Sequence, residues 1–429
     1  MIRALIPCAL VLAMLVQAPA AAQTLTSCTT ASQTLFVRDV MADIYYWNTE
    51  IPPVNAAQFN SPEAYLDRVR FRPLDESFSY IGLRAEQEAY YSSSRFIGFG
   101  FSHRFDGEGL QLSQVFPDSP AAEAGLRRGE VITAINGQTV VDLITAGQLN
   151  AALGPSAEGY GVDIQVRSTE STRDARMVKR PVTIPTVSHL SVYEVDGRKV
   201  GYLFFRNFVE PSIPALDEAF AALKGEGVTE LVLDLRYNGG GMVTVARHLA
   251  SLIGGSRTDG QVMAEYFHNR RNAFRNEVIR FEPREFALPL ERLVVVTSGA
   301  SASASEMIVN ALRPFLPVIT VGDQTYGKPV GQYGINFCDK VLYPVSFTLR
   351  NALGQGDYFG GIPADCAAGD DLTRQIGDAE ETSLKEALHV VRTGQCSAPL
   401  LAEGATARRR ATLAATPRAT GFQGIINAH

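Results

Sequence analysis

Short apolar runs alternate with longer amphipathic stretches through the second half of the chain, and this pattern predicts an α/β fold. Each run is nearly all apolar, rich in Val, Leu or Phe, and short enough for a buried strand. The stretches that follow repeat their apolar positions with helical spacing, and the last of them stops before Pro314. We therefore expect strands at residues 200–205, 230–235 and 293–297, and helices at 213–223, from about 243, and at 307–312.

The first part of the chain predicts a small helical region, residues 23–95. Apolar residues recur at helical spacing from Phe36 to Tyr45, and the two prolines at 52–53 end that helix. A second short helix is expected to begin after Ser61, a serine cap followed by proline at the first helical position. No catalytic constellation is apparent in this region.

Residues 1–22 have the pattern of a secretory signal peptide. Arg3 supplies the positive charge, residues 4–16 are apolar, and small residues precede a cleavage site after Ala22. The apolar run is too short to span a bilayer, so we expect an exported protein, periplasmic or secreted. The alternative is a lipoprotein anchored in the membrane through Cys28, because Leu-Thr-Ser-Cys has the residue types of a lipobox, although small and polar residues separate it from the apolar run.

The octet GASASASE at residues 299–306 lies between a predicted strand and a predicted helix, which makes it a tight strand-to-helix turn. A serine there sits at a helix N-terminus, where unpaired N–H groups and the helix dipole favour a developing oxyanion. Ser303 and Glu306 also have the S-x-x-E spacing of a capping box, in which both side chains satisfy free backbone donors. On the octet alone, catalysis and capping are both open.

A second motif, TYGKPVGQ at residues 325–332, follows the octet. This combination resembles the carboxyl-terminal processing peptidases, also called tail-specific or tricorn-like serine peptidases. The resemblance implies that Ser303 is the nucleophile, that Lys328 is its general base and that Gln332 orients the lysine. The family usually has glycine where Pro329 stands, and proline favours extended backbone at the residue before it. Because lysine accepts a serine proton only when its pKa is lowered, Lys328 is expected to be buried.

Residues 96–186 resemble a PDZ domain. The most specific string is SPAAEAGLRRGEVITAING at residues 119–137, in which Glu130 replaces the commoner Asp. PDZ domains add an extended peptide to a sheet edge and hold its terminal carboxylate with N–H groups of a Gly-containing loop. A PDZ fold that serves only as a regulatory spacer is the alternative. The resemblance implies that the peptide-binding loop consists of Ile97, Gly98, Phe99 and Gly100.

A third signature, DLRYNGGG at residues 234–241, joins a predicted strand to a predicted helix. Glycine at such a turn lets backbone N–H groups approach a substrate without an intervening side chain. The resemblance implies that an N–H from this loop, Gly240 in preference to Gly241, joins that of Ala304 as an oxyanion hole. A plain turn is the alternative for the glycines alone.

Composition changes this picture little. The 429 residues suffice for two or three domains, and 46% hydrophobic and 20% charged residues are typical of globular proteins. The net charge of −6 and the lack of basic clusters argue against nucleic-acid binding. No His/Cys cluster has the spacing of zinc ligands, so neither a metal nor a cofactor is expected. Asp234 and Arg236 are expected to pair structurally.

Cysteine content agrees with export. If Cys8 leaves with the signal peptide, an even number remains, as is usual in an oxidising compartment: Cys28, Cys338, Cys366 and Cys396. Three connectivities are possible. We favour Cys338–Cys366, which would close a local β-rich segment, together with Cys28–Cys396, which would tie the N-terminal region to the end of the catalytic domain.

These features predict an exported serine endopeptidase that acts on unfolded or C-terminally presented protein or peptide substrates. The resemblance implies an α/β fold with a crotonase/ClpP-like catalytic domain at 187–397, preceded by the PDZ domain and the helical region. Residues 398–429, rich in Ala, Thr and Arg, are expected to be a disordered tail. A Ser-His-Asp triad is the mechanistic rival, although no G-x-S-x-G elbow surrounds Ser303. The functional rival is a catalytically silent protein of the same fold that binds peptides or hydrophobic ligands.

Overall fold

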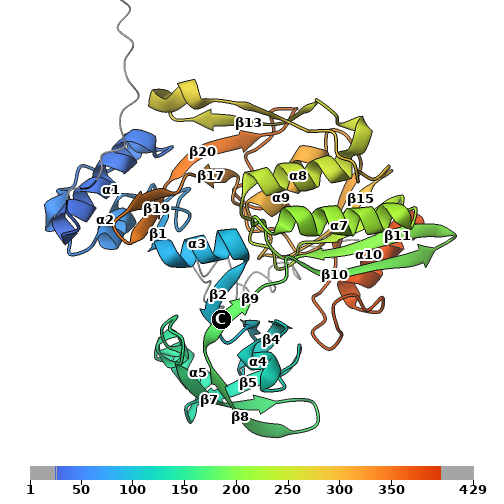
Figure 1. Cartoon of the computed structure of the whole chain (residues 1–429), viewed down its shortest axis with the longest axis horizontal. Helices are drawn as coiled ribbons and strands as arrows, with labels where there is room; N and C mark the ends of the chain where they lie inside the picture. Colours follow the sequence, from blue (N-terminus) through green and yellow to red (C-terminus); the bar gives the residue numbers. More distant parts are fainter. Residues whose placement is uncertain (1–24, 26, 398–429) are drawn as a thin grey trace, which may run out of the picture.

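The structure is a computed structural model that describes residue 25 and residues 27–397. The predicted signal peptide and the predicted tail lie outside the described residues. The described chain forms a large body and a smaller lobe (Figure 1). Strands β2 (Arg95–Gly98) and β9 (Arg180–Thr183) lead into and out of the lobe, and they pair antiparallel to form its neck.

The large body is organised around a six-stranded sheet. Its first two strands pair antiparallel, and every later pair of neighbours is parallel. The three strands expected from the sequence are its second, third and fourth members, which confirms the α/β class. In order across the sheet, the strands are β10 (Val187–Val195), β11 (Arg198–Phe205), β12 (Glu230–Asp234), β15 (Leu293–Thr297), β16 (Val318–Gly322) and β21 (Cys366–Ala367).

Helices cover both faces of this sheet, which explains why its central strands β12 and β15 are buried at every position. Within β15, Leu293 and Val295 pack against three helices, whereas Val294 and Val296 pack against a fourth on the other face, as the two-residue period of a strand requires. The three helices are α7 (Ser212–Gly225), α8 (Val243–Gly254) and α9 (Ala304–Leu312), and the fourth is α10 (Thr382–Thr393).

Two smaller sheets complete the large body. One has four strands in the order β14 (Val278–Arg280), β13 (Val262–His268), β20 (Val345–Arg350) and β17 (Val330–Gln332). The other has three, in the order β1 (Tyr80–Leu83), β19 (Lys340–Tyr343) and β18 (Ile335–Phe337). The short 3-10 helices η3 (Gly255–Arg257) and η4 (Arg270–Arg275) flank β13.

The N-terminal helical region packs on the three-stranded sheet of β1, β19 and β18. It comprises α1 (Thr30–Ile44), η1 (Asn48–Glu50), η2 (Ala56–Gln58), α2 (Pro62–Val69) and, after β1, α3 (Arg84–Ser93). Val37 of α1 and Leu66 of α2 share a core with Leu342 and Val345 of the large body. The N-terminal region is therefore held against the strands that follow Lys328 along the chain.

The smaller lobe has a hydrophobic core of its own, which includes Phe101, Leu110 and Val166. Its main strands lie in the order β3 (Phe101–Phe105), β4 (Leu110–Val115), β5 (Val131–Ile135), β7 (Gly161–Arg167) and β8 (Thr172–Val178), and β6 (Gln138–Thr139) pairs with β5. Its helices are α4 (Pro120–Glu123), α5 (Val140–Thr145) and α6 (Leu149–Leu153). Ser119 caps α4, since its hydroxyl accepts a hydrogen bond from the N–H of Ala122 at 3.1 Å.

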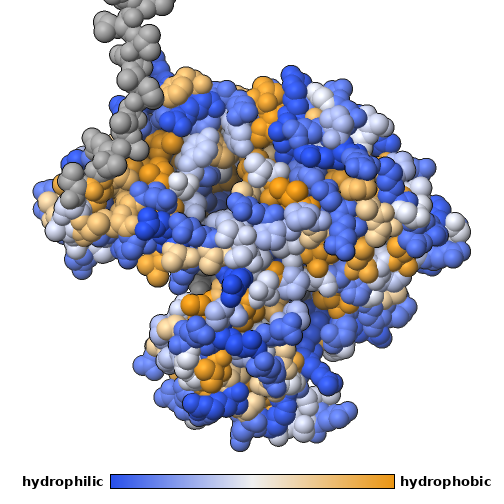
Figure 2. Space-filling view, in the orientation of Figure 1, coloured by the Kyte–Doolittle hydropathy of each residue, from blue (hydrophilic) through white to orange (hydrophobic). Residues whose placement is uncertain are grey.

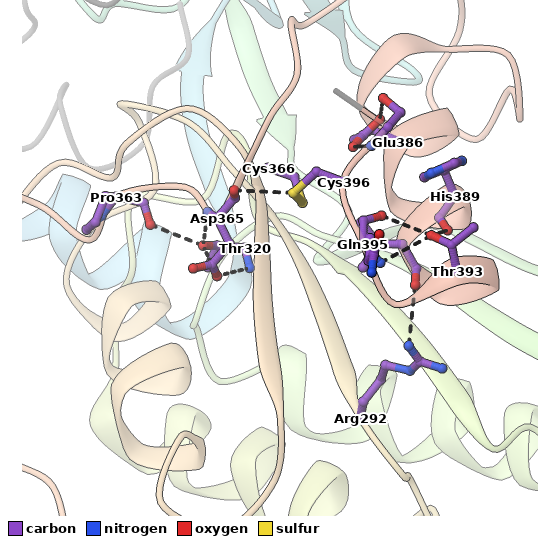
Figure 3. Close-up of a disulfide and its surroundings, with 12 residues drawn as sticks. Arg292, Thr320, Pro363, Asp365, Cys366, Glu386, His389, Thr393, Gln395 and Cys396 are labelled. Carbon is purple, nitrogen blue, oxygen red and sulfur yellow. Dashed lines mark hydrogen bonds between the residues drawn. A yellow bond between two sulfur atoms is a disulfide. The ribbon is translucent and has the colours of Figure 1, made fainter. Parts of the chain in front are cut away.

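Two disulfides join Cys28 to Cys338 and Cys366 to Cys396, so the pairing that we favoured from the sequence is wrong. Cys28 lies just before α1, which packs on the β18–β19 hairpin that holds Cys338 in its turn. Cys366 begins β21 at the sheet edge, and α10 crosses the sheet so that the Cα atoms of Cys366 and Cys396 lie 5.4 Å apart (Figure 3). The prediction relied on the short separation of Cys338 and Cys366 along the chain, but the two residues belong to different sheets.

The bond at Cys28 also bears on membrane anchoring. Lipidation would use the sulfur that is bonded to Cys338, so a lipid anchor at Cys28 and this disulfide exclude each other. Disulfides persist in oxidising compartments, which agrees with export. Within residues 27–397, no helix combines the length and the apolar content that a membrane span requires.

Removing the Cys28–Cys338 bond by the double substitution Cys28→Ala, Cys338→Ala is expected to lower the free energy of unfolding by about 2 to 5 kcal/mol. The bond joins residues 310 positions apart, so it restricts the unfolded chain strongly. Equilibrium urea unfolding measures the change. Cys366→Ala, Cys396→Ala is the matched control, with a separation of only 30 residues; a larger loss there would contradict the argument.

Candidate active site

Ser303 ends a turn, residues 298–303, that we call the serine turn; it connects β15 to α9. Its backbone has φ +55° and ψ −113°, whereas an ordinary helix-capping residue has extended backbone. Backbone strain of this kind, at a residue other than glycine, is concentrated at functional sites. Ala304, which begins α9, has no partner for its N–H within the helix. The turn thus places a hydroxyl beside a free backbone donor at the positive end of a helix.

Lys328 lies in the loop at residues 323–329 between β16 and β17, which we call the lysine loop. Its Nζ donates a hydrogen bond to Oε1 of Gln332 at 2.6 Å. Burial of the ammonium lowers the pKa of Lys328 to about 8, against the opposing effect of the carboxylates of Asp75 and Glu306. The pKa of the lysine is therefore close to the value that a general base needs near neutral pH.

Glu306 is fully buried in α9 and holds the serine turn and the lysine loop together. Its Oε2 accepts hydrogen bonds from the N–H of Ser303 at 2.9 Å and the N–H of Lys328 at 2.8 Å. Its Oε1 accepts from the N–H of Gly327 at 2.7 Å and the hydroxyl of Thr325 at 2.5 Å. Burial raises the pKa of Glu306, and these four hydrogen bonds oppose that rise. The bond from Ser303 is the glutamate half of the predicted capping box, so capping and site assembly are compatible.

Residues 236–241, the glycine loop, lie directly against the serine turn. Gly240 has φ +98°, and a Cβ there would stand 2.8 Å from Cβ of Ser303 and 2.9 Å from the nitrogen of Ala304. Its N–H, however, donates to Oδ1 of Asn238 at 2.9 Å. The hydroxyl of Ser305 donates to the carbonyl of Asn238 at 2.8 Å, which ties the glycine loop to α9. The predicted oxyanion donor is thus adjacent to Ser303, but its hydrogen bond is made within its own loop.

The predicted pairing of Asp234 with Arg236 is confirmed. The two side chains form a buried ion pair at 2.8 Å, and Arg236 also pairs with Glu381 at 2.9 Å. Tyr237, the next residue, receives a hydrogen bond on its hydroxyl from Arg128 of the smaller lobe at 2.6 Å. The lobe therefore contacts the loop at residues 236–241 through Tyr237.

The serine turn, the lysine loop and the glycine loop border one cavity of about 280 Å³. Ser303, Ala304, Lys328 and Gln332 all line it, as do Gly239 and Gly241. The other lining residues are mostly apolar or aromatic: Tyr80, Tyr91, Met242, Val243, Met307, Val330, Gly331, Gly334, Tyr343, Phe347, Leu349 and Tyr358. Figure 2 shows the large body hollowed between its N-terminal region and the helices of the main sheet.

The predicted peptide-binding loop lies at the neck of the smaller lobe and does not line this cavity. Ile97 and Gly98 pair with β9, and Phe99 is fully buried. The carbonyl of Gly100 accepts hydrogen bonds from the N–H of Phe116 at 2.9 Å and the hydroxyl of Ser119 at 3.3 Å. Peptide binding by this loop stays a prediction.

One group in the described part of the chain has the residue types of a metal site: Cys366, Glu386 and Cys396. The two sulfurs are bonded to each other and so do not act as thiolate ligands (Figure 3). The hydroxyl of Ser397 donates to Glu386, and the N–H of Ser397 donates to the same carboxylate at 2.9 Å. These contacts give the glutamate a structural role.

Three family models match separate parts of the chain. They are peptidase family S41 at residues 199–352, the peptidase S41 N-terminal domain at 32–80 and a PDZ domain at 111–156. The carboxyl-terminal-processing protease of Picosynechococcus is 30% identical over 304 residues, which cover 63% of this chain and 68% of that protein. The chain belongs to peptidase family S41.

Other S41 proteins extend the comparison. The carboxy-terminal-processing protease of Bartonella bacilliformis is 25% identical over 295 residues, which cover 66% of this chain and 65% of that protein. Four of the curated relatives, this one included, are matched over 44% to 65% of their own length, so the chain spans about half to two thirds of them.

Two solved structures are similar to this S41 chain. A putative S41 protease from Bacteroides fragilis has a TM-score of 0.69 at 26% identity, covering 83% of this chain and 96% of that one. The photosystem II D1 C-terminal processing protease has a TM-score of 0.51 at 20% identity, covering 83% and 97%, and supports the fold alone. The fold is that of an S41 peptidase with a PDZ domain and an N-terminal helical region.

Sequence reasoning missed the contribution of the N-terminal region to this site. Tyr80 and Tyr91 line the cavity, and the backbone carbonyl of Phe78 accepts a hydrogen bond from Gln332 at 2.6 Å. Their segment contains no motif. The pairing of β1 with β19 helps to bring it beside the lysine loop, and no local sequence signal reports that pairing.

Proposed function

We propose that the protein is an exported serine endopeptidase that hydrolyses peptide bonds with Ser303 and Lys328 as a catalytic dyad. The observation that carries the proposal is the environment of Lys328. The lysine lines the same cavity as Ser303, its ammonium donates to Gln332, and burial lowers its pKa to about 8. A lysine in this environment has a useful neutral fraction near physiological pH, as nucleophilic catalysis by serine requires.

In the first half-reaction, Oγ of Ser303 attacks the scissile carbonyl carbon while Nζ of Lys328 takes the hydroxyl proton. The C–N bond then breaks as Nζ gives that proton to the departing amine, which leaves an ester on Ser303. In the second half-reaction, water attacks the ester and Nζ takes a proton from the water. The proton returns to Oγ as the new carboxyl end departs, so each cycle restores the enzyme. Gln332 positions Lys328 through the 2.6 Å hydrogen bond.

The oxyanion would be held by the N–H of Ala304 and by a donor of the glycine loop. Gly240 stays the first candidate because of its position against Ser303, and Gly241 is the second. For Gly240 to donate, its N–H has to exchange Oδ1 of Asn238 for the substrate oxygen.

Gly240→Ala keeps the backbone N–H but is expected to displace it from the oxyanion, which would lower kcat by about a hundredfold to a thousandfold, the usual effect of losing one oxyanion donor. The new methyl group would stand 2.8 Å from both Cβ of Ser303 and the carbonyl of Ala302, at a backbone φ of +98° that disfavours alanine. Steady-state cleavage of a fluorogenic peptide measures kcat and KM separately. Gly225→Ala, on the open end of α7, is the control and is expected to retain wild-type kcat.

A Ser-His-Asp mechanism finds no support in the cavity, because none of the histidines within residues 27–397 lines it. His248 hydrogen-bonds to Asp217 at 2.8 Å and His268 to Tyr333 at 2.9 Å, and none of these four residues lines the cavity. A silent binding protein of the same fold remains the second candidate. It would keep the cavity but show no turnover.

The lining of the cavity favours an apolar substrate side chain beside the scissile bond, since Lys328 is the one charged residue among the described residues that line it. We further propose that the PDZ domain, residues 96–186, binds or gates extended substrate ends through residues 97–100. The catalytic domain would then be residues 187–397, following a helical region at 23–95. Removal of the signal peptide at residues 1–22 would release the protein outside the cytoplasm.

The pH dependence of cleavage tests the proposal. Because Lys328 acts as a base, only its neutral form is active, so kcat/KM is expected to rise about tenfold per pH unit below about pH 8 and to level off above it. Reduced casein is a suitable unfolded substrate, and Ser303→Ala is the blank. A plateau reached near pH 6.5 would indicate a histidine base and contradict the proposal. No cleavage at any pH would favour the silent binding protein.

A further inference from the structure

We propose that residues 75–79 of the N-terminal region are a positioning element of the lysine site, in which Phe78 fixes Gln332 and Asp75 supplies a nearby negative charge. The inference rests on the proposed function, because it concerns the residue that we take to be the general base. It assigns a role in the chemistry to a region in which the sequence indicated none.

Phe78 determines which way the amide of Gln332 faces. The Nε2 of Gln332 donates to the carbonyl of Phe78 at 2.6 Å and to the carbonyl of Tyr343 at 2.7 Å. An amide nitrogen has two protons, so both are used, and Oε1 must point to Lys328. The ring of Phe78 also lies beneath the ammonium, with Nζ of Lys328 5.8 Å from the ring centre. One residue of the N-terminal region thus contacts both the lysine and the side chain that orients it.

Asp75 holds this segment in place. It is fully buried and accepts hydrogen bonds from the hydroxyl of Tyr45 at 2.9 Å, and from the N–H and the hydroxyl of Ser79 at 2.9 and 2.6 Å. The hydroxyl of Ser79 accepts in turn from the N–H of Val345 at 2.9 Å. Asp75 therefore fastens the segment to the end of α1 on one side and to β20 on the other.

Two further contacts join the segment to the strands around the lysine. The hydroxyls of Ser77 and Tyr326 lie 3.4 Å apart, and the rings of Phe78 and Tyr326 lie 6.0 Å apart. The Cys28–Cys338 disulfide adds a covalent tie between the N-terminal region and the hairpin that follows Gln332. The segment is thus fixed to the lysine loop rather than resting loosely on it.

The charges around Lys328 give the segment a measurable effect. Burial lowers the pKa of Lys328, and the negative charges of Asp75, from the N-terminal region, and Glu306, from α9, oppose that shift. Arg70 donates to the carbonyl of Ser79 at 3.2 Å and faces the same segment. The remaining titratable groups on the cavity wall are tyrosines whose pKa burial raises, so they are uncharged near neutral pH: Tyr80 on β1, Tyr91 on α3, Tyr343 on β19 and Tyr358.

Asp75→Asn should therefore make Lys328 easier to deprotonate. The negative charge of Asp75 raises the Lys328 pKa, whereas burial lowers it. Without that charge the Lys328 pKa falls, and the acid limb of the activity profile moves to lower pH. A shift of about half a pH unit is expected, which makes kcat/KM at pH 6 about threefold higher than that of the wild type. A residue that acted only through stability would lower activity instead.

The direct test is an NMR titration of the lysine side chain in protein labelled with ¹³C-lysine. Ser303→Ala serves as the background, so no turnover is needed, and Lys328→Met assigns the signal. We expect Lys328 to titrate about half a pH unit lower when Asp75→Asn is added. Tyr45→Phe is a matched control, because it removes one hydrogen bond to the same carboxylate but keeps the charge. Asp67→Asn, an exposed carboxylate of the same region, is a second control. Neither control is expected to move the titration.

An unchanged or higher Lys328 pKa in Asp75→Asn overturns the inference, as does an equal fall in Tyr45→Phe. If Asp75→Asn fails to fold, Asp75→Ser leaves room for a water among the same donors and carries the same expectation. The wild type is assayed on casein in parallel. Absence of cleavage there would refute the proposed function, whereas the titration would still decide on the role of Asp75.

Discussion

Lys328→Met is expected to lower kcat/KM by at least about ten-thousandfold while the protein stays folded. Methionine has nearly the length of lysine but cannot accept the proton of Ser303, so the hydroxyl stays a poor nucleophile. Burial already disfavours the ammonium at this position, as the pKa of about 8 indicates. An uncharged side chain is therefore tolerated, and the melting temperature is expected to equal or exceed that of the wild type.

Cleavage of a fluorogenic peptide, with thermal unfolding by circular dichroism, measures both quantities for Lys328→Met. Lys385→Met is the matched control, since Lys385 is an exposed residue of α10 paired with Glu380. The control is expected to retain wild-type activity. If Lys328→Met folds normally and keeps more than about one hundredth of the wild-type activity, lysine is not the general base.

Glu306→Gln is expected to lower activity and stability together. Each carboxylate oxygen of Glu306 accepts at least one backbone N–H, with Ser303 and Lys328 on Oε2 and Gly327 on Oε1. An amide has only one accepting atom, so whichever way glutamine turns, its NH₂ group faces a backbone N–H. We expect the free energy of unfolding to fall by about 1 to 3 kcal/mol, the cost of leaving a buried donor unpaired.

The same substitution is expected to reduce kcat about a hundredfold or more, because the serine turn and the lysine loop lose their common anchor and small errors in position have large effects on rate. Urea unfolding and peptide cleavage measure the two effects. Glu380→Gln, at an exposed carboxylate, is the control for loss of a negative charge. Wild-type kcat in a folded Glu306→Gln protein would show that the carboxylate does not position the dyad.

The hydrophobic pattern of the sequence correctly predicted the strands and turns that are specified by residues adjacent in the chain. The run at 293–297 became β15, and the octet after it became the turn that leads into α9. The strand at 230–235 and the glycines after it likewise became β12 and a loop beside Ser303. In these cases the residues that specify the turn are neighbours in the chain, so the sequence was sufficient.

The parts that could not be predicted depend on packing between distant segments. The disulfide partners that we predicted for Cys338 and Cys366 were wrong. Their true partners lie next to α1 and α10, and the sequence of neither helix indicates where that helix packs. The engagement of the Gly240 N–H by Asn238 depends on one side-chain rotamer within the loop. The hydrogen bond between Gln332 and Phe78 depends on how the N-terminal region packs, including the pairing of β1 with β19.

The measurement that tests the central claim most directly is cleavage of reduced casein by the chain from residue 23 onward, with Ser303→Ala prepared alongside and both proteins checked for folding. We predict that the wild type produces peptides, that their new ends follow apolar residues, and that Ser303→Ala produces none. Equal cleavage by both proteins, or none by a folded wild type, would contradict the account.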